Sequence, residues 1–179
     1  MGTPHLNNNY FEELINIGIS LSKEKNINVL LENILNQARK ISKSDGGTLY
    51  VVDKNFTRLE FAIMQNKSKN IFLGGTNSPV PDSIYPVKLY DPETKEPNHK
   101  NVSAVCALKD RTIKIDDAYK NKQYDFEGTK GFDIKHDYHS KCFLNVPMKD
   151  HKNKVIGVIQ LLNPMKNGKI IKYSKEIIK

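Results

Sequence analysis

The sequence has few cysteines, no tryptophan and no long apolar run. It holds two cysteines and no tryptophan in 179 residues. Two cysteines are too few for the disulfide framework of a small secreted domain, so we expect free thiols in a reducing compartment. No run of about 18 apolar residues occurs, which argues against insertion into a membrane. The polar stretch 1–9 also lacks the basic and apolar segments of a signal peptide, and we therefore expect a cytoplasmic protein.

Arginine is scarce as well, although the net charge is +8. The basic residues are almost all lysine, and the three arginines are Arg39, Arg58 and Arg111. Eight lysines and two acids lie in residues 149–179, which therefore supply most of the excess charge. Proteins that read nucleic acids commonly use arginine forks and aromatic residues interleaved with basic ones, and neither pattern occurs. We expect a solvated lysine surface and no nucleic-acid partner.

The length fits one domain with one hydrophobic core. We take residues 1–179 as a single domain whose core covers about residues 28–163. Residues 1–27 hold an N-terminal helix, which Asn9 and Glu12 would cap. Residues 174–179 read as the start of a truncated C-terminal helix.

Hydrophobic periodicity predicts the elements between these two helices. One helix begins near Asn28 and ends at 45–47, because glycine supplies the positive φ of a helix exit. Apolar, β-branched and aromatic segments predict strands, and one apolar segment after them predicts a short helix. The strands cover 48–53, 58–65, 84–89, 112–115, 142–148 and 154–162, and the short helix covers 102–108.

Two stretches lack regular periodicity. Residues 66–99 hold five of the eight prolines, so no long helix fits there. Residues 116–141 are polar and dotted with aromatic side chains, and we interpret them as irregular. The segment 154–162 is apolar almost throughout, which is typical of a mid-sheet strand covered on both faces. Because regular βαβ alternation is absent, the order favours an antiparallel sheet with helices on one face and long loops over the other.

Four segments of the sequence resemble parts of a GAF domain. They are 30–53 (LLENILNQARKISKSDGGTLYVVD), 59–66 (LEFAIMQN), 101–119 (NVSAVCALKDRTIKIDDAY) and 132–163 (FDIKHDYHSKCFLNVPMKDHKNKVIGVIQLLN). The last is the most specific, since it joins Ser-Lys to Val-Pro-Met, a polar turn, and Val-Ile-Gly-Val with Gln-Leu-Leu-Asn. The resemblance implies an α+β, GAF/PAS-like fold with a central antiparallel sheet of about six strands. Helices would cover one face, and residues 66–141 would enclose a loop-covered pocket on the other.

GAF domains sense small molecules such as cyclic nucleotides, or dimerise with no known ligand. The resemblance therefore implies a non-catalytic regulatory sensor of a larger bacterial signal-transduction protein, with a homodimer formed through the terminal helices. The long insertion before 101–108 looks most like GAF domains that precede HD or HD-GYP phosphohydrolases. The implied output is thus a phosphohydrolase or phosphodiesterase domain in the same chain. The alternative of a ligand-free dimerisation or protein-interaction module stays open.

One departure from the family concerns cyclic nucleotides. Phosphodiesterase GAF domains that bind them carry Asn-Lys after the last strand and an Asp-Glu pair further on. Here Asn163 is followed by Pro164, and no Asp-Glu pair follows. A small ligand such as a cyclic nucleotide thus has no support from that motif, and we assign no cofactor.

We place the ligand pocket within residues 103–160. A buried site needs apolar walls and a few polar groups that fix the ligand. Ser103 and the backbone N–H groups at the start of its helix would suit an anion. The opposite interpretation, a small core closed under loops, stays open. The predicted wall residues are Tyr119, Phe126, Phe132 and Tyr138, and the predicted polar residues are Ser103, Asp116, Asp117, Asp133, Ser140 and Gln160.

The His-rich segment before the second hairpin resembles a metal cluster. Its members are Asp133, His136, Asp137 and His139. Metal ligands must converge, and a loop beside a strand does not place them so. We therefore interpret them as a surface cluster and expect no metal.

Cysteine chemistry is a further alternative, because free methionine-R-sulfoxide reductases share the GAF fold. Such chemistry needs a thiolate of low pKa and a resolving thiol. Cys106 lies in an apolar helix and Cys142 begins a core strand, so both are expected to be small buried hydrophobes. Ser-His-Asp, phosphate-loop and paired-carboxylate patterns do not occur, and we expect no enzyme in this chain.

Overall fold

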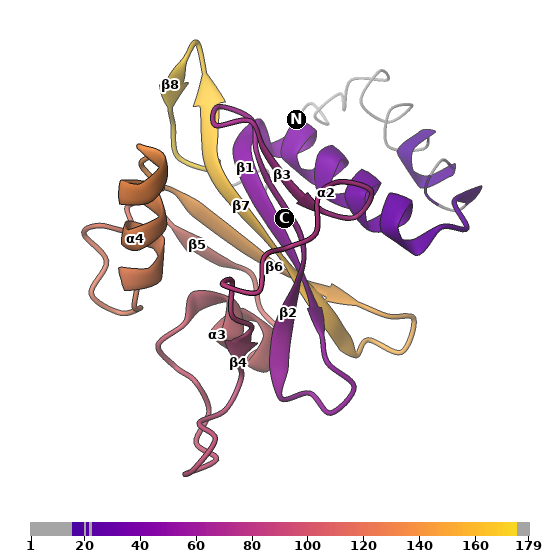
Figure 1. Cartoon of the computed structure of the whole chain (residues 1–179), viewed down its shortest axis with the longest axis vertical. Coiled ribbons are helices and arrows are strands. Elements are labelled where there is room, and N and C mark those ends of the chain that lie inside the picture. Colours follow the sequence, from indigo (N-terminus) through magenta and orange to yellow (C-terminus); the bar gives the residue numbers. More distant parts are fainter. Residues whose placement is uncertain (1–15, 20, 22, 175–179) are drawn as a thin grey trace, which may run out of the picture.

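The computed structural model describes residues 16–19, 21 and 23–174 of the chain. Within them, eight strands form one sheet with the main order β3-β2-β1-β7-β6-β5 (Figure 1). All paired strands run antiparallel, β4 pairs with β2, and β8 pairs with β7. The predicted antiparallel α+β fold is confirmed. The elements are α2 (Ile27–Ser42), β1 (Ser44–Val52), β2 (Arg58–Asn66), β3 (Ile71–Gly74), β4 (Val87–Lys88), α3 (Val102–Leu108), β5 (Ile113–Ile115), α4 (Glu127–His136), β6 (Phe143–Lys149), β7 (Val155–Lys166) and β8 (Lys169–Ile170).

Strand β7 lies in the middle of the sheet, between β1 and β6, as its apolar sequence predicts. Val158 is 0% exposed and packs in the core on one face, whereas Leu161 is 4% exposed and packs in the core on the other. Gly157 lets β7 approach its neighbours closely, because a Cβ there would overlap the Tyr50 carbonyl oxygen and Met148 Cε. The strand is therefore buried on both sides.

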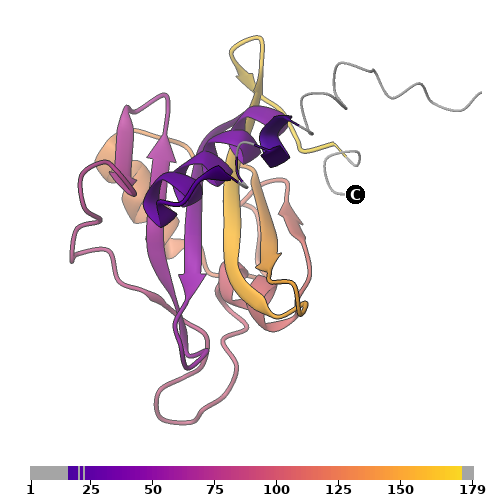
Figure 2. The same cartoon turned by 90° about the vertical axis from the view of Figure 1, so that its right-hand side faces the viewer.

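Helix α2 covers one face of the sheet, as Figure 2 shows. The Asn26 side chain caps its first turn by accepting from the N–H groups of Asn28 and Val29. Leu35 is the fully buried residue of the helix that anchors this core. The buried residues around it come from β1, β2, β6 and β7 and from the segment after β8: Leu49, Ile63, Cys142, Leu144, Leu161 and Tyr173.

The predicted end of this helix at 45–47 is wrong. The helix ends at Lys43, which takes the left-handed conformation at φ 56°, and β1 begins directly at Ser44. Gly46 and Gly47 are strand residues. Glycine at position 47 lets α2 pack closely on β1, since a Cβ there would lie 2.9 Å from Leu35 Cδ1.

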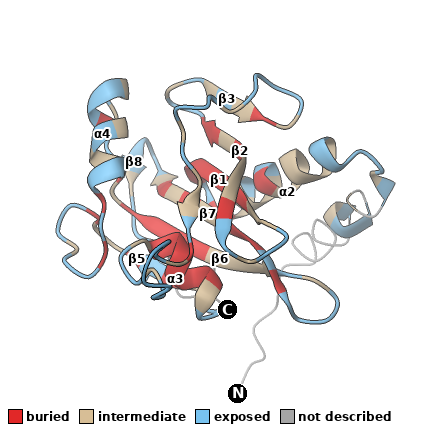
Figure 3. Cartoon of the chain, turned by 60° about the horizontal axis from the view of Figure 1, so that its bottom comes forward, coloured by how far each residue is buried: buried red, intermediate tan, exposed pale blue. Residues whose placement is uncertain are grey.

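Helices α3 and α4 lie on the opposite side of the sheet from α2 (Figures 1 and 2). Helix α3 matches its predicted range, and six of its seven residues are buried, as its colour in Figure 3 shows. Helix α4 was not predicted, because residues 116–141 read as irregular. It contains Gly128 and Gly131 and buries only Asp133, so no apolar stripe marks it in the sequence.

The remaining boundaries differ in detail. β1 begins four residues before its predicted start, and β7 continues four residues beyond its predicted end. β3 and β8 were not predicted, and β4 is much shorter than the predicted 84–89. The N-terminal helix is described only from residue 16, with 16–19, 21 and 23 helical. Of the predicted C-terminal helix, residues 175–179 lie outside the described residues. No described helix has the length and apolar character needed to cross a membrane.

Candidate functional site

A cluster of uncharged polar side chains interrupts the apolar sheet face beneath α3. Ser103, in the first turn of α3, donates from Oγ to Asn145 Oδ1 over 3.0 Å. Gln160 Nε2 donates to both Ser103 Oγ and Asn145 Oδ1 over 2.9 Å. Asn145 and Gln160 are direct partners on β6 and β7, so the sheet register brings their side chains together. The cluster thus joins one helix to two central strands.

Asn145 is the least accessible member of this cluster. It is 0% exposed, and its Nδ2 has no hydrogen-bond partner. A buried donor without an acceptor costs about 1–3 kcal/mol, so an acceptor supplied by a bound molecule would stabilise the protein here. Gln160 is half-buried and is therefore the more accessible of the two amides.

Tyr50 adjoins the same cluster on β1. Burial raises the pKa of its phenol above the ordinary value, and a hydrogen bond with Ser103 lowers it by a smaller amount. The hydroxyl therefore stays protonated and neutral. The whole cluster carries no charge, so it suits a neutral hydrogen-bonding group of a ligand better than a phosphate.

A second polar group surrounds Asp133 on α4. Its carboxylate accepts from the Tyr119 hydroxyl over 2.8 Å, and from the backbone N–H and the hydroxyl of Ser140 over 2.7 Å each. Burial and then Asp133 raise the pKa of Tyr119 to about 12, so this phenol remains a donor. The Asp133 side chain is 2% exposed and already has three donors. These bonds fix α4 to the segment that leads into β6.

A third polar group surrounds Tyr138. Its hydroxyl donates to Asp45 Oδ2 over 2.8 Å and accepts from Asn163 Nδ2 over 2.9 Å. Asn163 Oδ1 also accepts from the N–H groups of Lys141 and Cys142, at 2.8 and 3.0 Å. Asp45 Oδ1 accepts from the backbone N–H and the hydroxyl of Ser68, at 3.2 and 2.6 Å. The segment after α4 is therefore tied to β7, β1 and the β2–β3 turn.

The structure distributes the ten predicted pocket residues over several places. Ser103 and Gln160 meet in the cluster beneath α3, and Tyr119, Asp133 and Ser140 meet beside α4. Tyr138 faces Asp45. The other four are placed as follows: Phe126 packs on Phe143 in the core, Phe132 on His136, Asp116 pairs with Lys114 and Lys172, and Asp117 accepts from the N–H groups of Tyr119 and Lys120.

Sequence reasoning missed Asn145, Asp45 and Asn163. Asn145 carried a usable signal, because an amide within the apolar run CFLNVPM must find polar partners if that strand is buried. Nothing in the sequence around Asp45 or Asn163 indicates that either belongs to a polar group. Their partners lie far away in the sequence, and Asp45 read as part of a helix exit.

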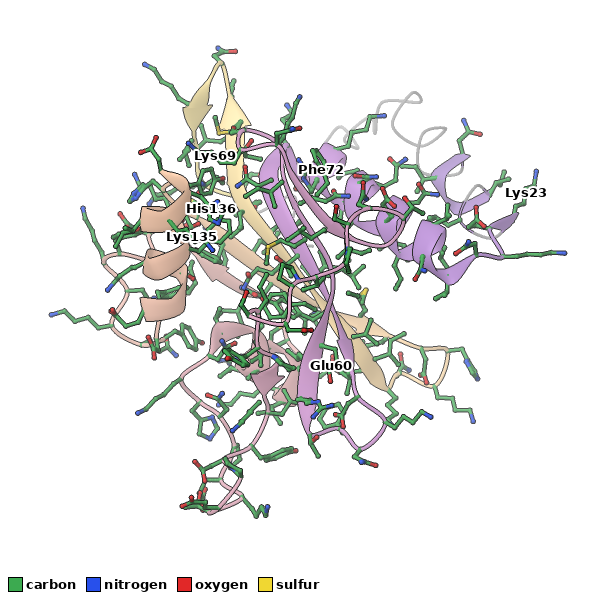
Figure 4. The ribbon with its side chains drawn as sticks, in the orientation of Figure 1. Lys23, Glu60, Lys69, Phe72, Lys135 and His136 are labelled. Atoms are coloured by element: carbon green, nitrogen blue, oxygen red, sulfur yellow. The ribbon has the colours of Figure 1, made fainter. Side chains whose placement is uncertain are left out.

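The side chains of the His-rich segment contact different residues and do not converge on one point. Asp133 and His136 lie on α4, and Asp137 pairs with Lys69 over 3.5 Å. The His136 ring, labelled in Figure 4, packs on Phe132 with centroids 4.3 Å apart. The His139 ring packs on Tyr119 with centroids 4.4 Å apart. Among the described residues, no group of three or more His, Cys, Asp and Glu side chains is placed to hold a metal ion.

Both cysteines are free and buried. Burial, with a smaller effect of Asp110, raises the pKa of the Cys106 thiol to about 12. Burial also raises the pKa of Cys142, whose Sγ donates to the Asp116 carbonyl over 3.1 Å. Protonated, buried thiols are poor nucleophiles. The two side chains act in this structure as small core residues.

Comparison with known proteins identifies the fold as that of GAF domains. The structure resembles the GAF domain of a phosphoenolpyruvate-protein phosphotransferase (ptsP) from Coxiella burnetii, with a TM-score of 0.63 and 12% identity over 93% of this chain and 82% of that one. It resembles free methionine-R-sulfoxide reductase from Neisseria meningitidis, with a TM-score of 0.59 and 15% identity over 94% and 79%. It also resembles a GAF domain/HD domain protein from Geobacter sulfurreducens, with a TM-score of 0.54 and 15% identity over 88% and 85%. The sequence matches no protein-family model and no curated protein.

Proposed function

We propose that the chain is a regulatory sensor domain that binds a small molecule against the sheet face beneath α3. The unpartnered Nδ2 of the fully buried Asn145 carries the proposal. A bound molecule that engaged the half-buried Gln160, so that its side-chain oxygen could accept from this group, would favour the liganded state. The fold supports the proposal, because the solved structures that it resembles include GAF domains of larger proteins.

The chemistry of the cluster restricts the ligand. Ser103, Asn145 and Gln160 are neutral and offer amide and hydroxyl hydrogen bonds. A molecule with an amide-like edge, such as a nucleobase, is therefore the best match. If a cyclic nucleotide binds, its base edge and not its phosphate is expected to face Gln160.

A thermal-shift screen tests this proposal. Cyclic mono- and dinucleotides, nucleobases and amino acids are added to the protein, and a ligand at 100 times its dissociation constant should stabilise it by about 2.7 kcal/mol. Gln160→Ala should abolish the shift, while Gln123→Ala, in the exposed loop before α4, should keep it. A hit with equal shifts in both variants would place the ligand elsewhere, and no hit at all would count against a sensor.

A ligand-free dimerisation or interaction module is the second candidate. The bonds within the Asp133 and Tyr138 groups favour it, because these polar atoms are already satisfied by one another. The homodimer would form through the terminal helices, and Ile27 at the start of α2 is 60% exposed. Sedimentation over a concentration series distinguishes the candidates. A dimer that forms without any ligand, together with an empty screen, would favour this second function.

We also propose that the sensor controls an output domain in the same chain, such as a phosphohydrolase or phosphodiesterase. The resemblance to a GAF domain/HD domain protein supports this pairing. The gene sequence beyond the codon for Lys179 tests it directly. A metal-dependent phosphohydrolase signature there is the expected result, and an unrelated neighbour would refute the proposed output while leaving the sensor proposal intact.

A further inference from the structure

An open hollow lies at the end of the sheet where α2 stops, which is its upper end in Figure 1. The last turns of α2, the start of β1, the β2–β3 turn and the end of β7 surround it, and its volume is about 610 Å³. This is within the range of about 300–1,000 Å³ found for small-molecule sites. Its lining residues are Asn36, Arg39, Lys40, Lys43, Ser44, Asp45, Lys67, Ser68 and Met165.

The charge of the hollow is strongly unbalanced. Four of its lining side chains are cationic and one, Asp45, is acidic. The Asp45 carboxylate is nearly buried and already accepts from Ser68 and Tyr138. It therefore offsets the charge of Arg39 without leaving an accessible anion. The exposed Lys43 and Lys67 add positive charge from two different elements.

Arg39 is the arginine among the cationic residues that line the hollow. Its Nη1 donates to Gln65 Oε1 over 2.7 Å and its Nη2 to the Asp45 carbonyl over 2.8 Å, so both ends of the guanidinium are held in place. Its Nε is buried and has no hydrogen-bond partner. Burial lowers the pKa of Arg39, against a smaller opposing effect of Asp45. A partly desolvated guanidinium of this kind gains from an anion placed near it.

The end of a helix normally repels anions, because its last carbonyls are unpaired. Here two of the last four carbonyls have a donor. The Lys43 N–H reaches the carbonyls of Arg39 and Lys40, and Ser42 Oγ donates to the carbonyl of Ala38 over 2.7 Å. The repulsion from the helix end is thereby reduced, and the cationic side chains dominate.

We propose that this hollow binds a small polyanion that carries phosphate groups. The volume suits a small molecule, and the lining supplies lysine, arginine, serine and asparagine donors. Among the described residues, none of those that line the hollow is aromatic, which favours recognition of phosphate groups over a planar ring. The site is distinct from the neutral cluster beneath α3 and does not depend on a ligand there.

Isothermal titration with tripolyphosphate at low and at physiological salt tests the site. One ion should bind per chain, and added salt should weaken the binding. Lys43→Asn combined with Lys67→Glu should reduce the affinity by about tenfold or more, since the hollow loses two positive charges and gains one negative charge. Asparagine is chosen because it tolerates the left-handed backbone of Lys43.

The matched control is Lys152→Glu combined with Lys154→Asn, which makes the same charge change in the exposed β6–β7 turn at the other end of the sheet. This variant should bind as the parent does. Equal losses in both double variants, or an absence of binding, would overturn the proposal. Tricarballylate, a trianion without phosphorus, should bind more weakly, and equal affinity would overturn the assignment to phosphate. Circular dichroism of each variant confirms that the fold is retained.

Discussion

The Tyr138 hydroxyl donates a 2.8 Å hydrogen bond to the Asp45 carboxylate across 93 positions of sequence. This contact joins the segment after α4 to the first residues of β1. Asp45 also lines the hollow at the end of α2, and Asn163 connects Tyr138 to β7. The bond therefore borders the hollow in which we propose that a polyanion binds.

Tyr138→Phe is expected to destabilise the fold by about 1–3 kcal/mol. The substitution removes a donor to a nearly buried carboxylate and one of the two acceptors of Asn163 Nδ2. Urea unfolding followed by circular dichroism measures the change. Tyr85→Phe is the control, since Tyr85 is 80% exposed and should melt like the parent. Identical unfolding midpoints for both variants would show that the bond adds no stability.

The protein is expected to lose stability in alkali. Burial raises the pKa of Tyr50, Tyr138 and Tyr173 above the value of 10.0 for an unperturbed tyrosine. The folded state thus keeps these protons after the unfolded chain has lost them. The contribution of these three tyrosines to the free energy of unfolding is fully present below about pH 10. It is lost as the pH rises through their pKa values in the folded state.

Urea unfolding between about pH 8 and pH 11 measures this loss, and tyrosinate absorbance follows ionisation in the native protein. Tyr138→Phe should make the unfolding free energy decrease less steeply with pH than Tyr85→Phe does. The prediction is wrong if every tyrosine of the native protein ionises near pH 10 without loss of stability.

Two glycine substitutions are expected to act in opposite directions. Gly157→Ala should destabilise by about 1–3 kcal/mol or more, because its Cβ would overlap backbone and side-chain atoms in the centre of the sheet. Gly131→Ala should stabilise by about 0.5–1 kcal/mol, since Gly131 is exposed within α4 and no atom lies within 4 Å of the added Cβ. Thermal unfolding of the two variants beside the parent decides both signs.

The cysteines are expected to resist alkylation in the native protein. Burial raises the pKa of both thiols, that of Cys106 to about 12, so the reactive thiolate is rare at neutral pH. Mass spectrometry after iodoacetamide should show modification only when denaturant is present. Rapid native labelling of Cys106, or methionine sulfoxide turnover that Cys106→Ala abolishes, would revive the reductase alternative.

The sequence predicted the elements that have strong periodicity. The apolar stripe of α2, the short apolar helix α3 and the β6–β7 hairpin each appear close to their expected positions. Gly46 and Gly47 misled the prediction, because glycine serves both turns and close packing. The helix ends because Lys43 takes a left-handed conformation, which cannot be predicted from a lysine in the sequence. Helix α4 was not predicted because its one buried residue is an aspartate, so the helix has no apolar stripe.

The candidate site was less predictable than the fold. Ser103 and Gln160 were expected in one pocket, and they bond to each other and to Asn145, whose burial depends on the register between β6 and β7. The basic hollow could not be predicted, because its charges come from α2 and a distant turn. Such groupings depend on tertiary packing, which residue spacing does not encode.

The edge strands have a consequence for self-association. β3 has four residues and β5 has three, while the long strands β1 and β7 lie inside the sheet. Beyond the end of β5, β6 contains Pro147, which has no N–H to offer. An incoming strand would therefore find too little unpaired backbone to extend the sheet. Stable association between copies must therefore use side-chain surfaces. Fibril-like assembly of native molecules by edge-to-edge strand pairing is disfavoured.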